Sequence, residues 1–103
     1  MLVGNIAKNF YLFSKANKVV SSVQEALQGI KNGSKILVGG FGICGVPMNL
    51  IQGVKELGVK DLTVVSNNCG YGNKDPANDW GLAVLLRNNQ IQRMISSYVG
   101  ENA

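Results

Sequence analysis

Two stretches of the sequence place apolar residues at helical spacing. Residues 23–30 and 50–57 each put four apolar side chains on one helical face: Val23, Ala26, Leu27 and Ile30 in the first, and Leu50, Ile51, Val54 and Leu57 in the second. Ser22 and Glu25 match a capping box, in which a hydroxyl and a carboxylate satisfy the first free amides of a helix. The pattern therefore predicts two amphipathic helices.

Glycine and proline mark the ends of these helices. Asn32-Gly33 ends the first helix and Gly58 ends the second, because glycine accepts the left-handed conformation that follows a helix. Pro47 suits the first turn of the second helix, where the missing N–H costs nothing. A third helix is predicted from Asp79, as its cap, to about Arg87.

Short apolar runs alternate with these helices. Residues 35–39, 62–66 and 93–99 read as strands, and the first two are apolar on consecutive positions, as in strands covered on both faces. The order helix, strand, helix, strand, helix, strand predicts right-handed crossovers and an α/β fold with a three-layer parallel sheet, Rossmann-like in type. Because the sequence ends just after its third strand, we expect the sheet to be incomplete, as half of a domain.

Composition narrows the function classes. The chain has 103 residues, of which 46% are hydrophobic, and its formal net charge is +4. The lysines are scattered rather than clustered, so nucleic-acid binding is disfavoured. The absence of histidine argues against a zinc site, and Cys44 and Cys69 suit a reducing compartment, packed as small side chains. No apolar run is long enough to span a bilayer.

The first 24 residues contain no acidic residue. Residues 1–17 combine Lys8, Lys15 and Ser14 with apolar and aromatic side chains, as in a mitochondrial transit peptide, although arginine is missing. An ordinary N-terminal tail is the alternative. A transit peptide would place the protein in the mitochondrial matrix, and an ordinary tail would place it in the cytoplasm.

A glycine-rich loop follows the first predicted strand. Gly40, Gly42 and Gly45 match G-x-G-x-x-G, whose amides can hold a phosphate, a carboxylate or an oxyanion, although the same glycines can simply make a tight turn. A dinucleotide site also needs an acid after the second strand, where Asn67 stands instead. A P-loop is excluded because no Gly-Lys-Ser/Thr follows.

The loop also carries a family resemblance. Residues 32–47, NGSKILVGGFGICGVP, resemble the A-subunit signature of the 3-oxoacid CoA-transferases, and every fixed position of that signature is met. The resemblance continues through LTVVSNN at 62–68 and QIQRMISSYVGEN at 90–102, and it covers residues 18–102. It implies that 18–103 are the N-terminal part of a CoA-transferase A domain.

The resemblance implies a reaction as well. In that family a glutamate attacks an acyl-CoA, and the CoA passes from succinyl-CoA to a 3-oxo acid such as acetoacetate, with the thioester as substrate and no cofactor. This chain would supply the wall that holds acyl-CoA and the carboxylate substrate, and the residues carried over for this role are Gly40, Phe41, Gly42, Gly45, Asn67 and Asn68. Asn67 stands at a strand end, where ligands of open α/β sheets bind.

The resemblance has limits within this sequence. Glu101 lacks the context of the family's nucleophilic glutamate, so no catalytic residue is expected here, and the chain alone is predicted to be inactive. The partners implied are the remainder of the A domain, the B domain and a second copy in a homodimer. Met48 replaces a frequent acid, and the 71–78 loop is longer than usual. The alternative is a non-catalytic α/β module that binds a phosphate, a carboxylate or a partner chain.

Overall fold

A computed structural model describes residues 17–100. The elements in chain order are α2 (Val23–Ala26), β1 (Lys35–Val38), α3 (Met48–Leu57), β2 (Leu62–Ser66), β3 (Gly70–Tyr71), the 3₁₀ helix η1 (Pro76–Asn78), β4 (Trp80–Gly81), α4 (Ala83–Arg87) and β5 (Ile91–Ser96). Residues 1–16 of the expected N-terminal segment, and Glu101, lie outside the described residues. None of the helices described is long and apolar enough to cross a bilayer.

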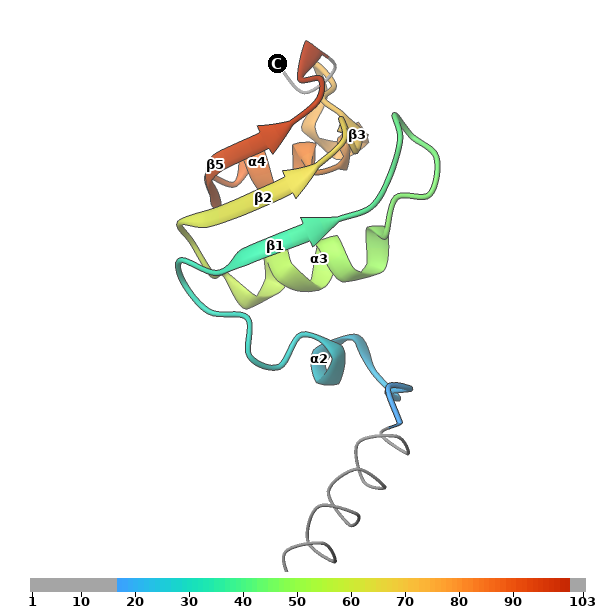
Figure 1. Ribbon diagram of the computed structural model, residues 1–103. Helices are drawn as coiled ribbons and strands as arrows, with labels where there is room; N and C mark the ends of the chain where they lie inside the picture. The colour runs from blue at the N-terminus through green and yellow to red at the C-terminus, as the bar shows by residue number, and fades with distance from the viewer. Residues whose placement is uncertain (1–16, 101–103) are drawn as a thin grey trace, which may run out of the picture.

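Three strands form a parallel sheet in the order β1-β2-β5. The arrows of all three point the same way in Figure 1, with β2 between its two partners. Ser66, the last residue of β2, is aligned with Val38 of β1 and with Ser96 of β5, so the three strands end at the same level. The predicted parallel α/β architecture is confirmed.

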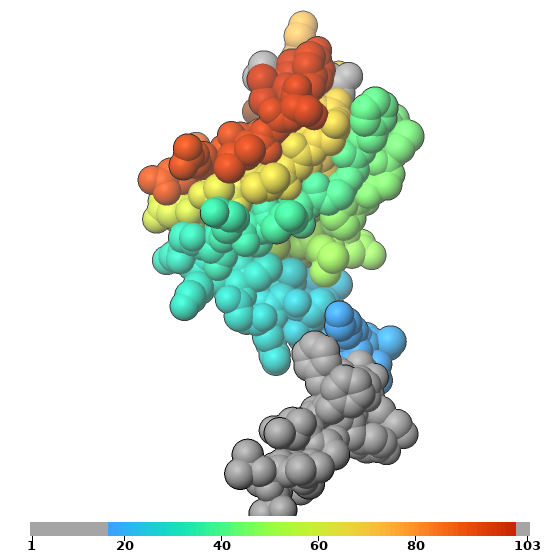
Figure 2. Space-filling view, viewed as in Figure 1, coloured from blue at the N-terminus to red at the C-terminus, as the bar shows by residue number. Residues whose placement is uncertain are grey.

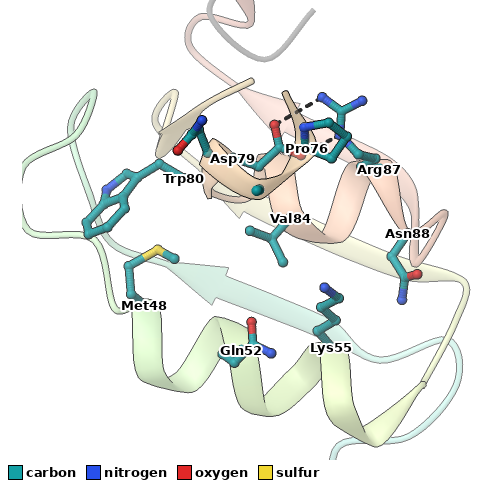
Figure 3. Close-up of a pocket in the computed structure, with 11 residues that line it drawn as sticks. Met48, Gln52, Lys55, Pro76, Asp79, Trp80, Val84, Arg87 and Asn88 are labelled. Carbon is teal, nitrogen blue, oxygen red and sulfur yellow. Dashed lines mark hydrogen bonds and ion pairs between the residues drawn. The ribbon is translucent and has the colours of Figure 1, made fainter. Parts of the chain in front are cut away.

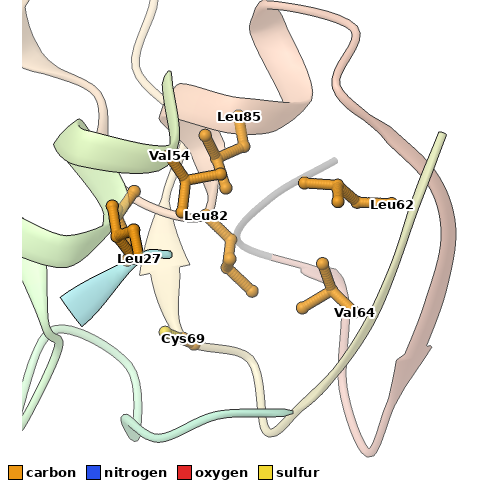
Figure 4. Close-up of a cluster of buried hydrophobic side chains, with 8 residues drawn as sticks. Leu27, Val54, Leu62, Val64, Cys69, Leu82 and Leu85 are labelled. Atoms are coloured by element: carbon orange, nitrogen blue, oxygen red, sulfur yellow. The ribbon is translucent and has the colours of Figure 1, made fainter. Parts of the chain in front are cut away.

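The described helices pack against one face of this sheet. Figure 1 shows α3 and α4 behind the strands, and Figure 4 shows the side chains that fill the space between the two layers. The buried cluster consists of Leu27, Ile51, Val54, Leu62, Val64, Cys69, Leu82 and Leu85. Burial of this apolar surface is the main force that holds helices to the sheet.

The other face of the sheet carries no described helix. Figure 2 shows β5, β2 and β1 as adjoining red, yellow and green bands on this face. Side chains of β1 alternate between the faces, so Ile36 and Val38 pack against the core while Leu37 is 81% exposed. In the described residues, β1 is therefore covered on one face only, although its consecutive apolar residues suggested cover on both.

The structure confirms some of the predicted ends of the first two helices and corrects others. The Ser22 hydroxyl accepts the Glu25 amide at 3.1 Å, whereas the Glu25 carboxylate binds Ser21 rather than Ser22. Helix α2 ends at Ala26, and Gly29 has a φ of +92°, so the predicted continuation to residue 30 is wrong. Helix α3 ends at Gly58 in the left-handed conformation, as predicted.

The last helix and strand lie differently from the prediction. Asp79 does not begin the third helix; it is the C-terminal cap residue of η1, it has extended backbone and it binds the guanidinium of Arg87, and α4 begins only at Ala83. The 71–78 loop runs between β3 and β4, which pair as a short antiparallel ladder. Strand β5 covers residues 91–96 rather than 93–99, because the chain turns where the Tyr98 amide donates to the Ser96 hydroxyl.

A buried glutamine connects three parts of this fold. Gln90 has no exposed surface, and its side-chain nitrogen donates to the carbonyl of Val54 in α3 at 3.0 Å and to that of Val59 at 2.9 Å. Its side-chain oxygen accepts from Asn88, and its backbone carbonyl accepts the amide of Leu62 in β2. Every polar group of this buried side chain is thus bonded, which is the condition for burying an amide at low cost.

We predict that Gln90→Leu lowers the free energy of unfolding by about 2–3 kcal/mol, because it removes the side-chain donor from the buried carbonyl oxygen of Val54 and from the half-buried one of Val59. Gln92→Leu is the matched control, since Gln92 is exposed on β5. The control should change the free energy of unfolding by less than about 0.5 kcal/mol. Denaturant unfolding of both variants measures the difference, and equal losses would contradict the role given to Gln90.

The pair Asp79–Arg87 makes stability depend on pH. Bonds from Arg87 and from the Asn73 amide hold the pKa of Asp79 below its usual value. Because the pKa is lower in the folded state, the pair stabilises the fold above the unfolded-state pKa, and that stabilisation is lost as pH falls through the folded-state pKa. We expect Asp79→Asn to lower Tm at neutral pH and to converge with the unmodified chain in acid. Thermal unfolding across this pH range measures the difference, and an equal loss of Tm at every pH would contradict the role given to the pair.

Candidate functional site

The carboxyl ends of the three parallel strands gather short polar segments at one edge of the sheet. Gly39 follows β1, Asn67 follows β2 and Ser97 follows β5. Serine hydroxyls tie these ends together: Ser66 donates to the carbonyl of Val38 at 2.7 Å, and the hydroxyl of Ser96 lies 2.7 Å from the carbonyl oxygen of Asn67. Ligands of open α/β sheets bind at such an edge.

The glycine loop is a tight, closed turn. Phe41 and Cys44 exchange two backbone hydrogen bonds of 2.9 Å each, so the four residues 41–44 form a compact unit. Gly40, Gly42 and Gly45 have φ values of +134°, +57° and +66°. L-residues with side chains rarely adopt these angles, so the three glycines are needed for the path of the backbone.

The base of the loop lies against the residues that follow β2. A Cβ atom on Gly40 would stand 2.9 Å from the sulfur of Cys69, and that sulfur donates to the carbonyl of Gly39 at 3.1 Å. Cys69 is buried, and burial raises the pKa of its thiol. From the sequence, Cys69 was expected only to pack as a small side chain, and its contact with Gly40 was not foreseen.

Asn68 holds the middle of the loop. Its side-chain oxygen accepts the Gly42 amide at 2.6 Å, and the Gly42 carbonyl accepts the Gly70 amide at 2.7 Å. Asn68 is 7% exposed, so its bond to the loop is shielded from water. Both the amide and the carbonyl of Gly42 are thus bonded to the segment that follows β2, and these two bonds fix the loop at this residue.

The side chain of Asn67 is turned toward β5. Its nitrogen donates to the Ser97 hydroxyl at 2.7 Å, and its oxygen accepts the Asn68 amide at 2.7 Å. The structure therefore places Asn67 at the predicted edge of the sheet with both ends of its amide bonded within the chain. Its contact with substrate stays a prediction.

The tip of the loop presents backbone amides and apolar side chains. Among the described residues, the amides of Ile43 and Gly45 have no acceptor in the protein. Phe41 and Ile43 are 74% and 65% exposed, and Cys44 is an exposed free thiol. These two N–H groups are therefore available to an acceptor outside the described chain.

Comparison with known proteins identifies the family of this chain. A family model described as Coenzyme A transferase matches residues 20–103, and the chain belongs to that family. Over 85 residues, the chain is 55% identical to the A subunit of the probable succinyl-CoA:3-ketoacid coenzyme A transferase of Bacillus subtilis, covering 82% of this chain and 33% of the relative.

Two further relatives come from a bacterium and a mammal. The chain is 51% identical to the A subunit of the succinyl-CoA:3-ketoacid coenzyme A transferase of Helicobacter pylori, over 84% of this chain and 34% of the relative. It is 48% identical to succinyl-CoA:3-ketoacid coenzyme A transferase 2B, mitochondrial, of Mus musculus, over 77% of this chain and 14% of the relative. The chain thus spans about a third of the length of these bacterial relatives. The resemblance read from the glycine loop is confirmed at the level of the family.

The bond between Asn68 and Gly42 predicts a local effect. In Asn68→Ala the Gly42 amide loses its acceptor, so we expect its hydrogen exchange to accelerate by about tenfold or more, the equivalent of one net hydrogen bond. Asn68→Asp keeps an oxygen at this position and should keep the protection. Amide-resolved hydrogen exchange measures both, and unchanged protection of Gly42 in the alanine variant would contradict the assignment.

Proposed function

We propose that this chain forms the substrate wall of an enzyme that transfers CoA from succinyl-CoA to a 3-oxo acid such as acetoacetate. The observation that supports the proposal most directly is the pair of free amides, of Ile43 and Gly45, at the tip of a loop that lies within the family match. Preorganised N–H donors stabilise the tetrahedral oxyanions through which acyl transfer passes.

In this proposal the chain orients and stabilises, and the nucleophile comes from elsewhere in the enzyme. The loop has no carboxylate, so the glutamate that attacks the thioester must belong to a segment with which the loop assembles. Gly40, Gly42 and Gly45 let the backbone approach the thioester, and Phe41 lies along its apolar part. Asn67 binds the carboxylate substrate, and Asn68 positions the loop.

The remaining features of the proposal follow the relatives. The bacterial relatives are named as one type of subunit, which suggests an assembly with further subunits or domains, and we propose that a homodimer of the complete enzyme is the active form. The CoA thioester is a substrate, and no cofactor takes part. The mouse relative is named as mitochondrial, which supports the matrix as location and the acid-free residues 1–17 as a transit peptide.

A chimera tests the proposal. Residues 20–103 would replace the matching segment of the Bacillus subtilis relative, and transfer of CoA from succinyl-CoA to acetoacetate would be assayed with the rest of its enzyme. We expect turnover within about tenfold of the unmodified relative. Adding Gly42→Val should lower turnover by about a hundredfold or more, because a β-branched side chain at φ +57° distorts the loop that carries the oxyanion donors.

Gly58→Val is the matched control in the same chimera. Gly58 has a similar φ of +68° with no atom near its Cβ position, and it lies at the opposite end of α3 from the loop. It should cost stability without a selective loss of turnover. A chimera that folds but transfers no CoA would contradict the proposal, and so would measurable turnover by the 103-residue chain alone.

A further inference from the structure

The chain makes a tight turn just before β1, at the end of that strand opposite the glycine loop. Asn32 and Gly33 are the two central residues of this turn, which the Ser34 amide closes by donating to the Lys31 carbonyl at 3.0 Å. Gly33 has a φ of +80°, the angle that the third residue of a type II turn requires. Asn32-Gly33 is the one Asn-Gly pair of the sequence, and both residues are exposed.

An Asn-Gly pair can lose ammonia without an enzyme. The backbone nitrogen of the glycine attacks the side-chain carbonyl carbon of the asparagine, and a C–N bond forms. The side-chain nitrogen leaves as ammonia with the proton of the backbone amide, and water then opens the cyclic imide at either carbonyl to give aspartate or isoaspartate. Asparagine is a thermolabile residue for this reason, and a following glycine favours the attack because it has no Cβ atom.

The surroundings of Asn32-Gly33 leave this reaction sterically open. A Cβ atom built on Gly33 would meet no atom within 4 Å. Among the described residues, the side-chain nitrogen of Asn32 makes no hydrogen bond, so the group that would leave faces water. The pair is therefore protected neither by crowding nor by a bond to the departing nitrogen.

Two hydrogen bonds to Lys60 hold the two reacting groups instead. The Lys60 amide donates to the side-chain oxygen of Asn32 at 2.9 Å, and the Gly33 amide donates to the Lys60 carbonyl at 3.0 Å. We call these two bonds the Lys60 clip. The first bond fixes the carbonyl group that would be attacked, and the second engages the N–H group that would attack. Because Asn32 and Lys60 are 28 positions apart, the clip exists only in the folded chain.

The Lys60 clip continues the pairing of β1 with β2 toward their amino ends. The regular ladder begins where Lys35 is aligned with Thr63, and the Thr63 amide donates to the Ser34 carbonyl at 3.0 Å. Figure 1 shows the turns that precede β1 and β2 at the same end of the sheet. Exposed bonds at the end of a strand pair open more often than those in a buried core. Each such opening frees both reacting groups of the Asn-Gly pair.

We propose that Asn32-Gly33 is a site of spontaneous deamidation whose rate is set by opening of the Lys60 clip. The product carries a new carboxylate directly before β1, and isoaspartate also lengthens the main chain there by a methylene group. The two bonds of the clip then no longer fit together, so the amino end of the β1–β2 pair is loosened irreversibly. The site lies at the other end of β1 from the glycine loop, so the inference does not depend on the proposed function.

The rates of deamidation in the full folded chain and in a peptide of residues 28–38 test the site. The peptide contains Asn32 and Gly33 but not Lys60, so it reports the reaction without the clip. Peptide mapping by mass spectrometry detects the replacement of NH by O and assigns it to a residue. We expect the product at Asn32 in both, formed at least about tenfold more slowly in the folded chain because the clip must open first. Equal rates, or a folded chain in which other asparagines react and Asn32 does not, would overturn the proposal.

Two variants at one position separate the clip from the lysine side chain. Lys60→Pro removes the backbone N–H that binds Asn32 and should accelerate deamidation there by about fivefold or more, whereas Lys60→Gln keeps that N–H and should leave the rate unchanged. Hydrogen exchange of the Gly33 amide in the unmodified chain is a second measure that needs no variant, and its protection should match the slowing of deamidation within about threefold. Equal rates in the two variants, or a Gly33 amide whose protection differs widely from that slowing, would contradict gating by the clip.

Discussion

The buried carboxamide of Gln90 is the group on which the arrangement of the fold depends. Helix α3 and strand β5 are not adjacent in sequence, and β5 must enter the sheet at the right height for its end to meet the other two. Gln90 helps to fix the position of β5 along β2. Its side chain bonds to α3 and to the turn after α3, and its backbone carbonyl accepts the amide of Leu62 in β2. A side chain with fewer polar groups would pack there equally well but would not define the register.

Once the strand ends are level, the candidate site is built almost wholly from backbone. Glycine supplies the path of the loop, and Asn68 fixes it from below through Gly42. Side chains at the strand ends bind one another rather than pointing into empty space, as the bond between Asn67 and Ser97 shows. These bonds join the loop and the strand ends to one another within the described chain.

Much of the fold could be predicted because its signals are local. The strand at 62–66 depends on the burial of its apolar side chains, and the end of α3 depends on the left-handed conformation of Gly58. Both features were predicted correctly. Asp79 was assigned to a helix cap because its sequence context allows one, but Arg87, eight residues away, competes successfully for its carboxylate. That ion pair is a tertiary contact, and no spacing rule within the segment indicates it.

The candidate site, like the fold, could be predicted only in part. The glycines predicted the loop, since three positive φ angles in six residues need glycine. The bonds that hold the loop join residues 26 or more positions apart, from Gly42 to Asn68 and from Gly39 to Cys69, and these follow only from the sheet register. A cleft between α3 and the segment from η1 to α4 (Figure 3) was missed for a similar reason, because residues 48–55 and 76–88 meet only in the folded chain.

The two thiols of the chain differ sharply in accessibility, and this has a consequence for its chemistry in a cell. Cys44 stands on the outer side of the loop, whereas Cys69 is sealed beneath Gly40 with a pKa raised by burial. Thiol reagents can therefore reach Cys44 in the folded chain, whereas burial shields Cys69. Oxidative modification of the folded chain is thus expected first at Cys44, on the exposed surface of the glycine loop.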